Sequence, residues 1–230
     1  MCGRYTQTAP LTLDKLQRRF VIDWIHPDTP PGPRYNIAPT QIAPVLMQDG
    51  QRRIALPMRW GLAPSWAQDE KIGARMINAR VETIAEKPSF RQAFFQRRCM
   101  ALADGFYEWV QDSGGAKQPY RFVLKSREPF GFAGLWERWQ PPGRTPLLTF
   151  TIITRPANQF MKPYHPRMPV ILRRQDEAAW LDPELRDKDA LMQLLLPRKS
   201  RMMECHPVAD VVNSPHHDTP QCVEQQLELF

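Results

Sequence analysis

The sequence has no long apolar segment. No run of about 18 apolar residues, the length that spans a bilayer, occurs anywhere in the 230 residues. The first residues, Met-Cys-Gly-Arg-Tyr-Thr-Gln-Thr, are polar and lack the apolar stretch of a secretory signal peptide. We therefore expect a cytoplasmic protein that makes no contact with a membrane.

Cysteine is also scarce. The four cysteines, Cys2, Cys99, Cys205 and Cys222, lie far apart and form no C-x-x-C pair. In a reducing compartment they are expected to stay free thiols, so a disulfide framework is excluded. We predict no metal site and no cofactor; the pairs Cys205-His206 and His216-His217 are the one place where the residue types would suit zinc.

Acidic residues are fewer than basic ones. Lys and Arg number 31 against 24 Asp and Glu, which gives a formal net charge of +7 and a pI near 9.5. Such an excess favours an anionic partner such as nucleic acid, although a merely basic protein has the same composition. Arginine supplies most of the excess, and its guanidinium group binds phosphate through two parallel hydrogen bonds.

Proline is abundant, with 24 residues spread along the chain, and this spacing favours short strands joined by turns over a helical bundle. Strands are predicted at Ile42–Met47, Arg53–Trp60, Cys99–Val110, Tyr120–Leu124, Phe130–Trp139, Leu147–Thr154 and Pro169–Leu172. Helices are predicted at Thr12–Phe20, Pro88–Arg97, Asp176–Leu181 and Pro183–Leu196. The sum is a single α+β domain with a curved, mostly antiparallel sheet.

Cysteine at position 2 suggests a particular chemistry. Initiator methionine is normally removed before a small residue, and its removal would leave Cys2 with a free α-amine beside its own thiol. The pKa values of these groups, about 8 and about 8.5, leave part of the amine uncharged near neutral pH. A 1,2-aminothiol condenses with an aldehyde to an imine and then closes a thiazolidine ring. Taken alone, however, a cysteine at this position is more often an accident.

Several further motifs accompany Cys2 in a fixed order. They are Met1-Cys2-Gly3-Arg4-Tyr5, Arg34-Tyr35-Asn36-Ile37-Ala38-Pro39-Thr40, Arg59-Trp60-Gly61-Leu62-Ala63-Pro64-Ser65-Trp66, Ile77-Asn78-Ala79-Arg80-Val81-Glu82-Thr83, Asp104-Gly105-Phe106-Tyr107-Glu108-Trp109 and His165-Pro166-Arg167-Met168-Pro169. As a set they closely resemble the SOS-response-associated peptidase (SRAP) family, also described as abasic-site processing proteins. The resemblance runs from residue 1 to about 213. It predicts one SRAP domain over 1–213 and a C-terminal tail over 214–230 that can be flexible.

The resemblance implies a barrel-like curved sheet flanked by helices, the SRAP fold, around a basic cleft for single-stranded DNA. It implies a thiazolidine cross-link between the N-terminal cysteine and a ring-opened abasic site, which shields the lesion during replication, with an accompanying lyase side activity. The implied catalytic residues are Cys2, Asn36, Glu108 and His165, with Cys2 as nucleophile and Asn36 orienting it. The implied DNA-binding residues are Arg4, Trp66, Asn78, Arg80, Thr154 and Arg167. The expected protein is a nucleoid-associated monomer.

The residue types agree with these roles. Imine formation needs a base to take a proton from the amine and an acid to expel hydroxide, and Glu108 and His165 supply one group of each kind. Either residue alone is more often structural; their occurrence together with Cys2 and Asn36 changes that judgement. Arginine and tryptophan bind phosphates and stack on bases without reading sequence.

The last residues suggest a second partner. Gln226-Leu227-Glu228-Leu229-Phe230 resembles the pentapeptide with which bacterial repair proteins dock on the sliding clamp. A flexible tail can place two apolar side chains in a pocket while Gln226 bonds at its rim. The alternative is an amphipathic end with no partner.

Two other functions remain open at this stage. One is an N-terminal-nucleophile glutamine amidotransferase, in which Cys2 would attack an amide carbon through sulfur. The other is a non-covalent reader of modified or single-stranded DNA, which would bind without Cys2. The downstream set of Asn36, Asn78, Glu108 and His165 favours the cross-linking function over both.

Overall fold

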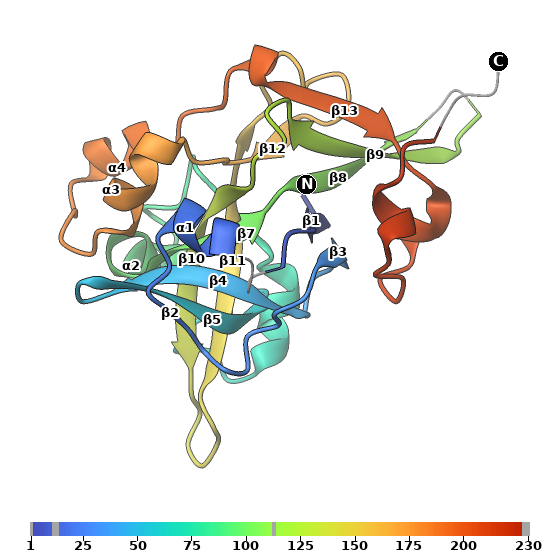
Figure 1. The fold of residues 1–230 in the computed structure, drawn as a ribbon. Coiled ribbons are helices and arrows are strands. Elements are labelled where there is room, and N and C mark those ends of the chain that lie inside the picture. Colours follow the sequence, from blue (N-terminus) through green and yellow to red (C-terminus); the bar gives the residue numbers. More distant parts are fainter. Residues whose placement is uncertain (1, 11–13, 112–113, 227–230) are drawn as a thin grey trace.

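Two β-sheets and a group of short helices make up the computed structural model, which describes residues 2–10, 14–111 and 114–226 (Figure 1). The larger sheet has eight strands, in the order β12-β11-β10-β7-β4-β5-β2, with β6 added alongside β11. Its strands are β2 (Trp24–Ile25), β4 (Ile42–Asp49), β5 (Arg52–Trp60), β6 (Asn78–Arg80), β7 (Arg98–Ala103), β10 (Phe130–Trp139), β11 (Leu147–Pro156) and β12 (Arg167–Pro169).

This larger sheet closes on itself. Strand β11 pairs with β10 on one side, and through Thr149 and Phe150 it also pairs in parallel with Arg59 and Trp60 of β5. The strands β5, β4, β7, β10 and β11 therefore form a closed circuit, which leaves none of them with an open edge. The predicted α+β fold with a mostly antiparallel, barrel-like core is confirmed.

The smaller sheet is entirely antiparallel and has five strands in the order β13-β9-β8-β1-β3. Its strands are β1 (Tyr5–Gln7), β3 (Arg34–Ile37), β8 (Gly105–Gln111), β9 (Lys117–Leu124) and β13 (Met203–Pro207). This sheet carries β1, the first strand of the chain, which lies between β8 and β3 (Figure 1).

The predicted single strand at Cys99–Val110 is wrong, because the chain changes sheets at Asp104. Residues before it belong to β7 and those after it to β8. The Asp104 carboxylate accepts hydrogen bonds from the Thr6 hydroxyl at 2.6 Å, from the Thr8 amide at 2.6 Å and from Arg121 Nη2 at 3.0 Å. Gly105 is required beside it, since a Cβ there would come within 2.8 Å of the Arg121 guanidinium. This corner is made by a buried hydrogen-bond network between residues far apart in the chain, so the local pattern of apolar residues does not reveal it.

Helices cover one face of the large sheet. They are α1 (Asp14–Phe20), α2 (Pro88–Gln96), α3 (Glu177–Leu181) and α4 (Lys188–Leu194), with 3-10 turns η1 (Glu70–Arg75), η2 (Arg174–Asp176), η3 (Ser200–Met202), η4 (Asp210–Asn213) and η5 (Pro220–Val223). Helix α2 begins at Pro88, a residue suited to a first turn, and buries Phe90 and Phe94. The predicted helix at Pro183–Leu196 is shorter, because the Asp187 side chain caps a helix that begins at Lys188.

The large sheet has a hydrophobic core on each side. Neighbouring residues of one strand enter different cores: Leu46, Met100 and Ile153 pack toward the helices, whereas Val45, Ala101 and Ile152 pack toward the small sheet. Strands buried on both faces lose the alternation of apolar and polar residues. Cys2 and Tyr5 belong to the second core, which lies between the two sheets.

Residues after 213 pack against the domain as far as the structure describes them. Cys222 is fully buried and packs with Tyr107 and Val208, and Gln225 forms a bridge with Val208. The domain boundary at 213 stays a prediction, and Leu227, Leu229 and Phe230 of the clamp-like motif lie outside the described residues. No helix in the described ranges has the length and apolarity needed to cross a bilayer.

Candidate functional site

Cys2 lies fully buried between the two sheets. We call the place where Cys2, Glu108 and His165 approach one another the seam. Its carbonyl oxygen accepts a hydrogen bond of 2.9 Å from Asn78 Nδ2, and its thiol lies 3.9 Å from the carbonyl of Arg4. Burial, together with the negative charge of Glu108, raises the pKa of the Cys2 thiol. Burial between the sheets therefore favours the protonated thiol.

Glu108 reaches the same seam from β8. This strand pairs with β1, where the Tyr107 amide donates to the Arg4 carbonyl at 3.0 Å. The Glu108 side chain is only 4% exposed, and burial raises its pKa, while the positive charge of His165 acts in the opposite direction. Glu108 therefore lies near both the thiol of Cys2 and the imidazole of His165.

His165 comes from the turn before β12, where its amide donates to the Met161 carbonyl at 3.0 Å. Its Nδ1 lies 3.0 Å from both the main-chain amide and the main-chain carbonyl of Arg167, so it can accept from the first or donate to the second. The main chain of Arg167 therefore holds the imidazole in place whichever ring nitrogen carries the proton. The seam therefore combines an N-terminal thiol, a carboxyl group with a raised pKa and an oriented imidazole.

The two predicted asparagines have different neighbours from those expected. Asn78, predicted only to line the site, is the one that holds Cys2. Asn36 is fully buried, and its Nδ2 donates to the carbonyls of Val212, Ser214 and His217 at 2.7–3.1 Å. In the described part of the chain Asn36 makes no hydrogen bond with Cys2, so any orienting effect passes through Arg4.

Arg4 is occupied by protein groups. Its Nη1 donates to Asn36 Oδ1 at 2.8 Å and to the Val212 carbonyl at 2.7 Å, and its Nη2 donates to the Asn213 carbonyl at 3.1 Å. The guanidinium carbon lies 5.9 Å from the centre of the Trp109 ring. Arg4 therefore fastens the C-terminal segment to the strand that follows Cys2, and a phosphate contact would have to compete with these bonds.

Arg80, Thr154 and Arg167 come together on neighbouring strands. In the pairing of β6 with β11, Arg80 stands opposite Thr154, and β12 places Arg167 opposite Pro156. Arg80 is exposed, but Thr154 is fully buried. The Thr154 carbonyl accepts from Arg167 Nη2 at 2.7 Å, so Thr154 supports an arginine rather than facing solvent itself.

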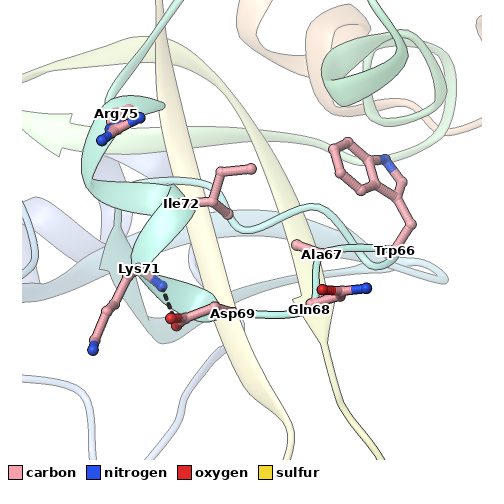
Figure 2. Close-up of a pocket in the computed structure, with 7 residues that line it drawn as sticks. All are labelled: Trp66, Ala67, Gln68, Asp69, Lys71, Ile72 and Arg75. Carbon is pink, nitrogen blue, oxygen red and sulfur yellow. Dashed lines mark hydrogen bonds between the residues drawn. The ribbon is translucent and has the colours of Figure 1, made fainter.

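Trp66 stands on the surface with 59% of its area exposed. It lies at the edge of a hollow of about 530 Å³ lined also by Gln68, Lys71 and Arg75 (Figure 2). A second hollow, of about 730 Å³, adjoins Trp66 and the α2 residue Arg91. The two hollows also contain the acidic residues Asp69 and Glu86. An exposed indole is suited to stacking on a base.

Asp218 escaped the sequence analysis. Its Oδ1 accepts hydrogen bonds from the amides of Tyr35 at 2.5 Å and Asn36 at 2.9 Å, and its Oδ2 pairs with Arg34 Nε. It thereby caps β3, an edge strand of the small sheet. No local signal identifies Asp218, because its partners lie more than 180 residues earlier in the chain.

The residue types that bind metals do not gather. Within the described ranges, no three His, Cys, Asp or Glu side chains come together as metal ligands. All four cysteines are free thiols.

Comparison with known proteins gives a consistent result. The sequence model described as SOS response associated peptidase (SRAP) matches residues 1–215. The protein is 45% identical to the abasic site processing protein YoqW of Bacillus subtilis, over 97% of this chain and 99% of that protein. It is 36% identical to the abasic site processing protein HMCES of Gallus gallus, over 97% of this chain and 77% of that protein.

The structure gives the same answer. A crystal structure of a Bacteroides thetaiotaomicron protein superposes with a TM-score of 0.86 at 27% sequence identity, covering 98% of this chain and 100% of that one. Sequence and fold agree over nearly the whole length. The chain belongs to the SOS response associated peptidase (SRAP) family.

Proposed function

We propose that this protein processes abasic sites in single-stranded DNA by forming a covalent bond through Cys2 after Met1 is removed. The observation that carries the proposal is the seam itself, where the second residue of the chain is buried between the two sheets, is held by Asn78 and lies near the buried Glu108. The names of the relatives support the substrate class, because YoqW and HMCES are both called abasic site processing proteins.

The proposed reaction uses the free amine and the thiol in turn. The Cys2 amine attacks the C1′ aldehyde of the ring-opened deoxyribose, and the carbinolamine loses one water to give an imine. The thiol then adds across the C=N bond: sulfur bonds to C1′, its proton passes to nitrogen, and a thiazolidine forms. The product equals protein plus DNA minus one water, and no oxidant or reductant is needed.

Glu108 and His165 are proposed to move the protons. Burial raises the pKa of the Glu108 carboxyl group above its ordinary value, so it holds a proton more readily than an exposed carboxyl group, which suits it to act as acid as well as base. His165, whose Nδ1 is held by the main chain of Arg167, would act through Nε2 on the departing hydroxyl group. Asn78 holds the Cys2 carbonyl, which limits the positions that the new amino terminus can adopt.

The bond would protect the lesion. An abasic aldehyde promotes strand cleavage by β-elimination, and a thiazolidine removes that aldehyde. The imine that precedes ring closure could itself eliminate, which gives lyase activity as a side reaction. The peptidase activity in the family name would be the removal of Met1 from the chain's own amino terminus.

Intact-mass spectrometry of untagged protein tests the proposal. The purified protein should lack Met1, and incubation with single-stranded DNA containing one abasic site should add the mass of the DNA minus one water. Cys2→Ala should give no adduct that survives boiling detergent, whereas Cys205→Ala, which changes a half-buried thiol elsewhere, should react like the wild type. A permanent N-terminal tag, which turns the amine into an amide, should also abolish the adduct.

The same samples separate the alternatives. A glutamine amidotransferase would release ammonia from glutamine and leave DNA unmodified, and a non-covalent reader would bind DNA equally well as Cys2→Ala. An adduct in the tagged protein, or in a protein that retains Met1, would disprove the proposed chemistry.

Docking on the sliding clamp through the last five residues remains a second, separate proposal. Gln226 is the only member of the motif within the described residues, and its amide donates to the Pro207 carbonyl at 3.0 Å. The motif would therefore start at the rim of the domain, next to β13. Equal recovery of the clamp by the full chain and by a chain ending at Gln225 would disprove this partner.

A further inference from the structure

Arg167, an arginine assigned to phosphate binding, already holds a carboxylate. Its Nη1 donates to Glu82 Oε1 at 2.5 Å and its Nη2 to Glu82 Oε2 at 3.0 Å, a parallel two-bond pair. Nη2 also donates to the Thr154 carbonyl at 2.7 Å. The guanidinium edge that would bind a phosphate is thus occupied in the DNA-free protein.

Glu82 is surrounded by positive charge. Hydrogen bonding to Arg167 lowers the pKa of Glu82, and the nearby charge of Arg80 acts in the same direction. Arg155, on β11, also interacts with Glu82 electrostatically. A single carboxylate therefore sits among three arginines, two of which belong to the proposed DNA-binding set.

The two partners differ in exposure. The Arg167 side chain is 14% exposed, while that of Glu82 is 43% exposed. Arg167 is also held by its hydrogen bond to the Thr154 carbonyl, whereas Glu82 lies in the turn after β6. The cation is therefore the anchored member, and the anion is the one that can swing into solvent.

A carboxylate and a phosphate present the same pair of oxygen atoms to a guanidinium group. We propose that Glu82 is an internal phosphate mimic. Its carboxylate binds the two terminal nitrogens of Arg167, and a backbone phosphate displaces it from them when single-stranded DNA binds. This inference rests on the proposed function, since it concerns the DNA-binding side of the same site. Its consequence is weak holding of undamaged strands, so that lasting attachment depends on the covalent bond.

Fluorescence anisotropy with an undamaged oligothymidine tests this without involving the covalent step. Glu82→Gln should bind roughly three- to tenfold more tightly than the wild type at low salt, the range that an exposed ion pair can account for. The slope of log affinity against log salt should become steeper by up to about 0.7, as expected for one more available cation on a single strand.

Glu184→Gln is the matched control. Glu184 is an exposed glutamate between α3 and α4, away from the seam, so its substitution makes the same change in net charge. We expect it to alter affinity less than twofold. If Glu82→Gln behaves like Glu184→Gln, or binds more weakly than the wild type, the proposal is wrong.

A double-substitution cycle with Arg167→Gln tests the mechanism, with circular dichroism to verify folding. In the Arg167→Gln protein, Glu82→Gln should raise the affinity for undamaged DNA less than twofold, because no guanidinium group remains that the loss of Glu82 could free for a phosphate. An equal gain would mean that Glu82 acts by general repulsion of DNA, which overturns the proposal.

The outcomes also separate this inference from the proposed function. If the wild type forms no adduct with abasic DNA but Glu82→Gln still binds undamaged DNA more tightly, only the proposed chemistry fails. If the adduct forms and Glu82→Gln changes nothing, only the inference about Glu82 fails. Absence of any DNA binding in all variants disproves both.

Discussion

Replacing Asp218 should loosen the C-terminal segment and slow the reaction at Cys2. The wild-type carboxylate satisfies two main-chain amides, those of Tyr35 and Asn36, and pairs with Arg34. The Asp218 and Arg34 side chains are 25% and 20% exposed, so water screens the ion pair. Most of the stabilisation should therefore come from the two amide contacts rather than from the charge pair.

The two substitutions at this position separate these contributions. In Asp218→Asn the amide oxygen can still accept from both main-chain amides, and the loss is mainly the screened ion pair, about 1 kcal/mol. In Asp218→Ala both amides lose their partner at about 1–2 kcal/mol each and the ion pair is lost as well, so the total loss is about 3–5 kcal/mol. For a chain of this size that corresponds to a fall in Tm of roughly 6–20 °C, against about 3 °C for the asparagine variant.

Urea denaturation monitored by tryptophan fluorescence measures the free energy of unfolding of both variants. Adduct formation with abasic DNA measures the functional effect. Because Asn36 and Arg4 both bind the carbonyls of residues 212–217, the alanine variant should form adduct more slowly even where it is fully folded. Equal destabilisation by asparagine and alanine would refute the reasoning, since it would place the stabilisation in the charge pair.

Other substitutions test separate parts of the structure. Burial raises the pKa of Glu108 in the folded protein, so the folded state binds more protons between the unfolded and folded pKa values, and stability falls as pH rises through that interval. Glu108→Gln should therefore gain in unfolding free energy relative to the wild type as pH rises above about 4, while adduct formation slows roughly a hundredfold; a constant difference across pH, measured in urea, would contradict the buried carboxyl. Arg98 is only 4% exposed and donates to the carbonyls of Phe94, Phe95, Trp180, Asp182 and Leu185. Arg98→Met should lower the free energy of unfolding by more than about 3 kcal/mol, because these carbonyls lose their donor. A calorimetric Tm close to wild type would show that water replaces the guanidinium group. Trp66→Ala should change unfolding free energy by less than about 0.5 kcal/mol, since the ring is 59% exposed, yet weaken single-stranded DNA binding by about 1–3 kcal/mol; unchanged affinity would remove Trp66 from the DNA path.

The long strands and the best helix were predictable because local composition is enough to specify them. Phe130–Trp139 and Leu147–Thr154 are rich in aromatic and β-branched residues, and they match β10 and most of β11. Helix α2 was predictable from its starting proline and the spacing of its phenylalanines. These segments carry their own signal, and the tertiary structure only places them.

The short strands were not predictable. Strands β1, β3, β6 and β13 have three to five residues each, too few for a periodic pattern to emerge. They are strands only because they pair with neighbouring strands: β1 with β8, β3 with β1, β6 with β11, and β13 with β9. The predicted strand at Pro169–Leu172 shows the converse: the regular strand ends at Pro169, although the amides of Val170 and Leu172 still donate to the carbonyls of Ile153 and Gly131.

The amino-acid sequence alone determines which chemical groups are present: an aminothiol that one cleavage would release, a carboxyl group, an imidazole and an excess of arginine. Their reactivity is decided by the folded chain. Burial in the seam raises the pKa of Glu108, Asn78 rather than Asn36 holds Cys2, and Glu82 occupies Arg167. These properties depend on desolvation and on contacts between residues far apart in the chain, and neither exists until both sheets have closed around Cys2.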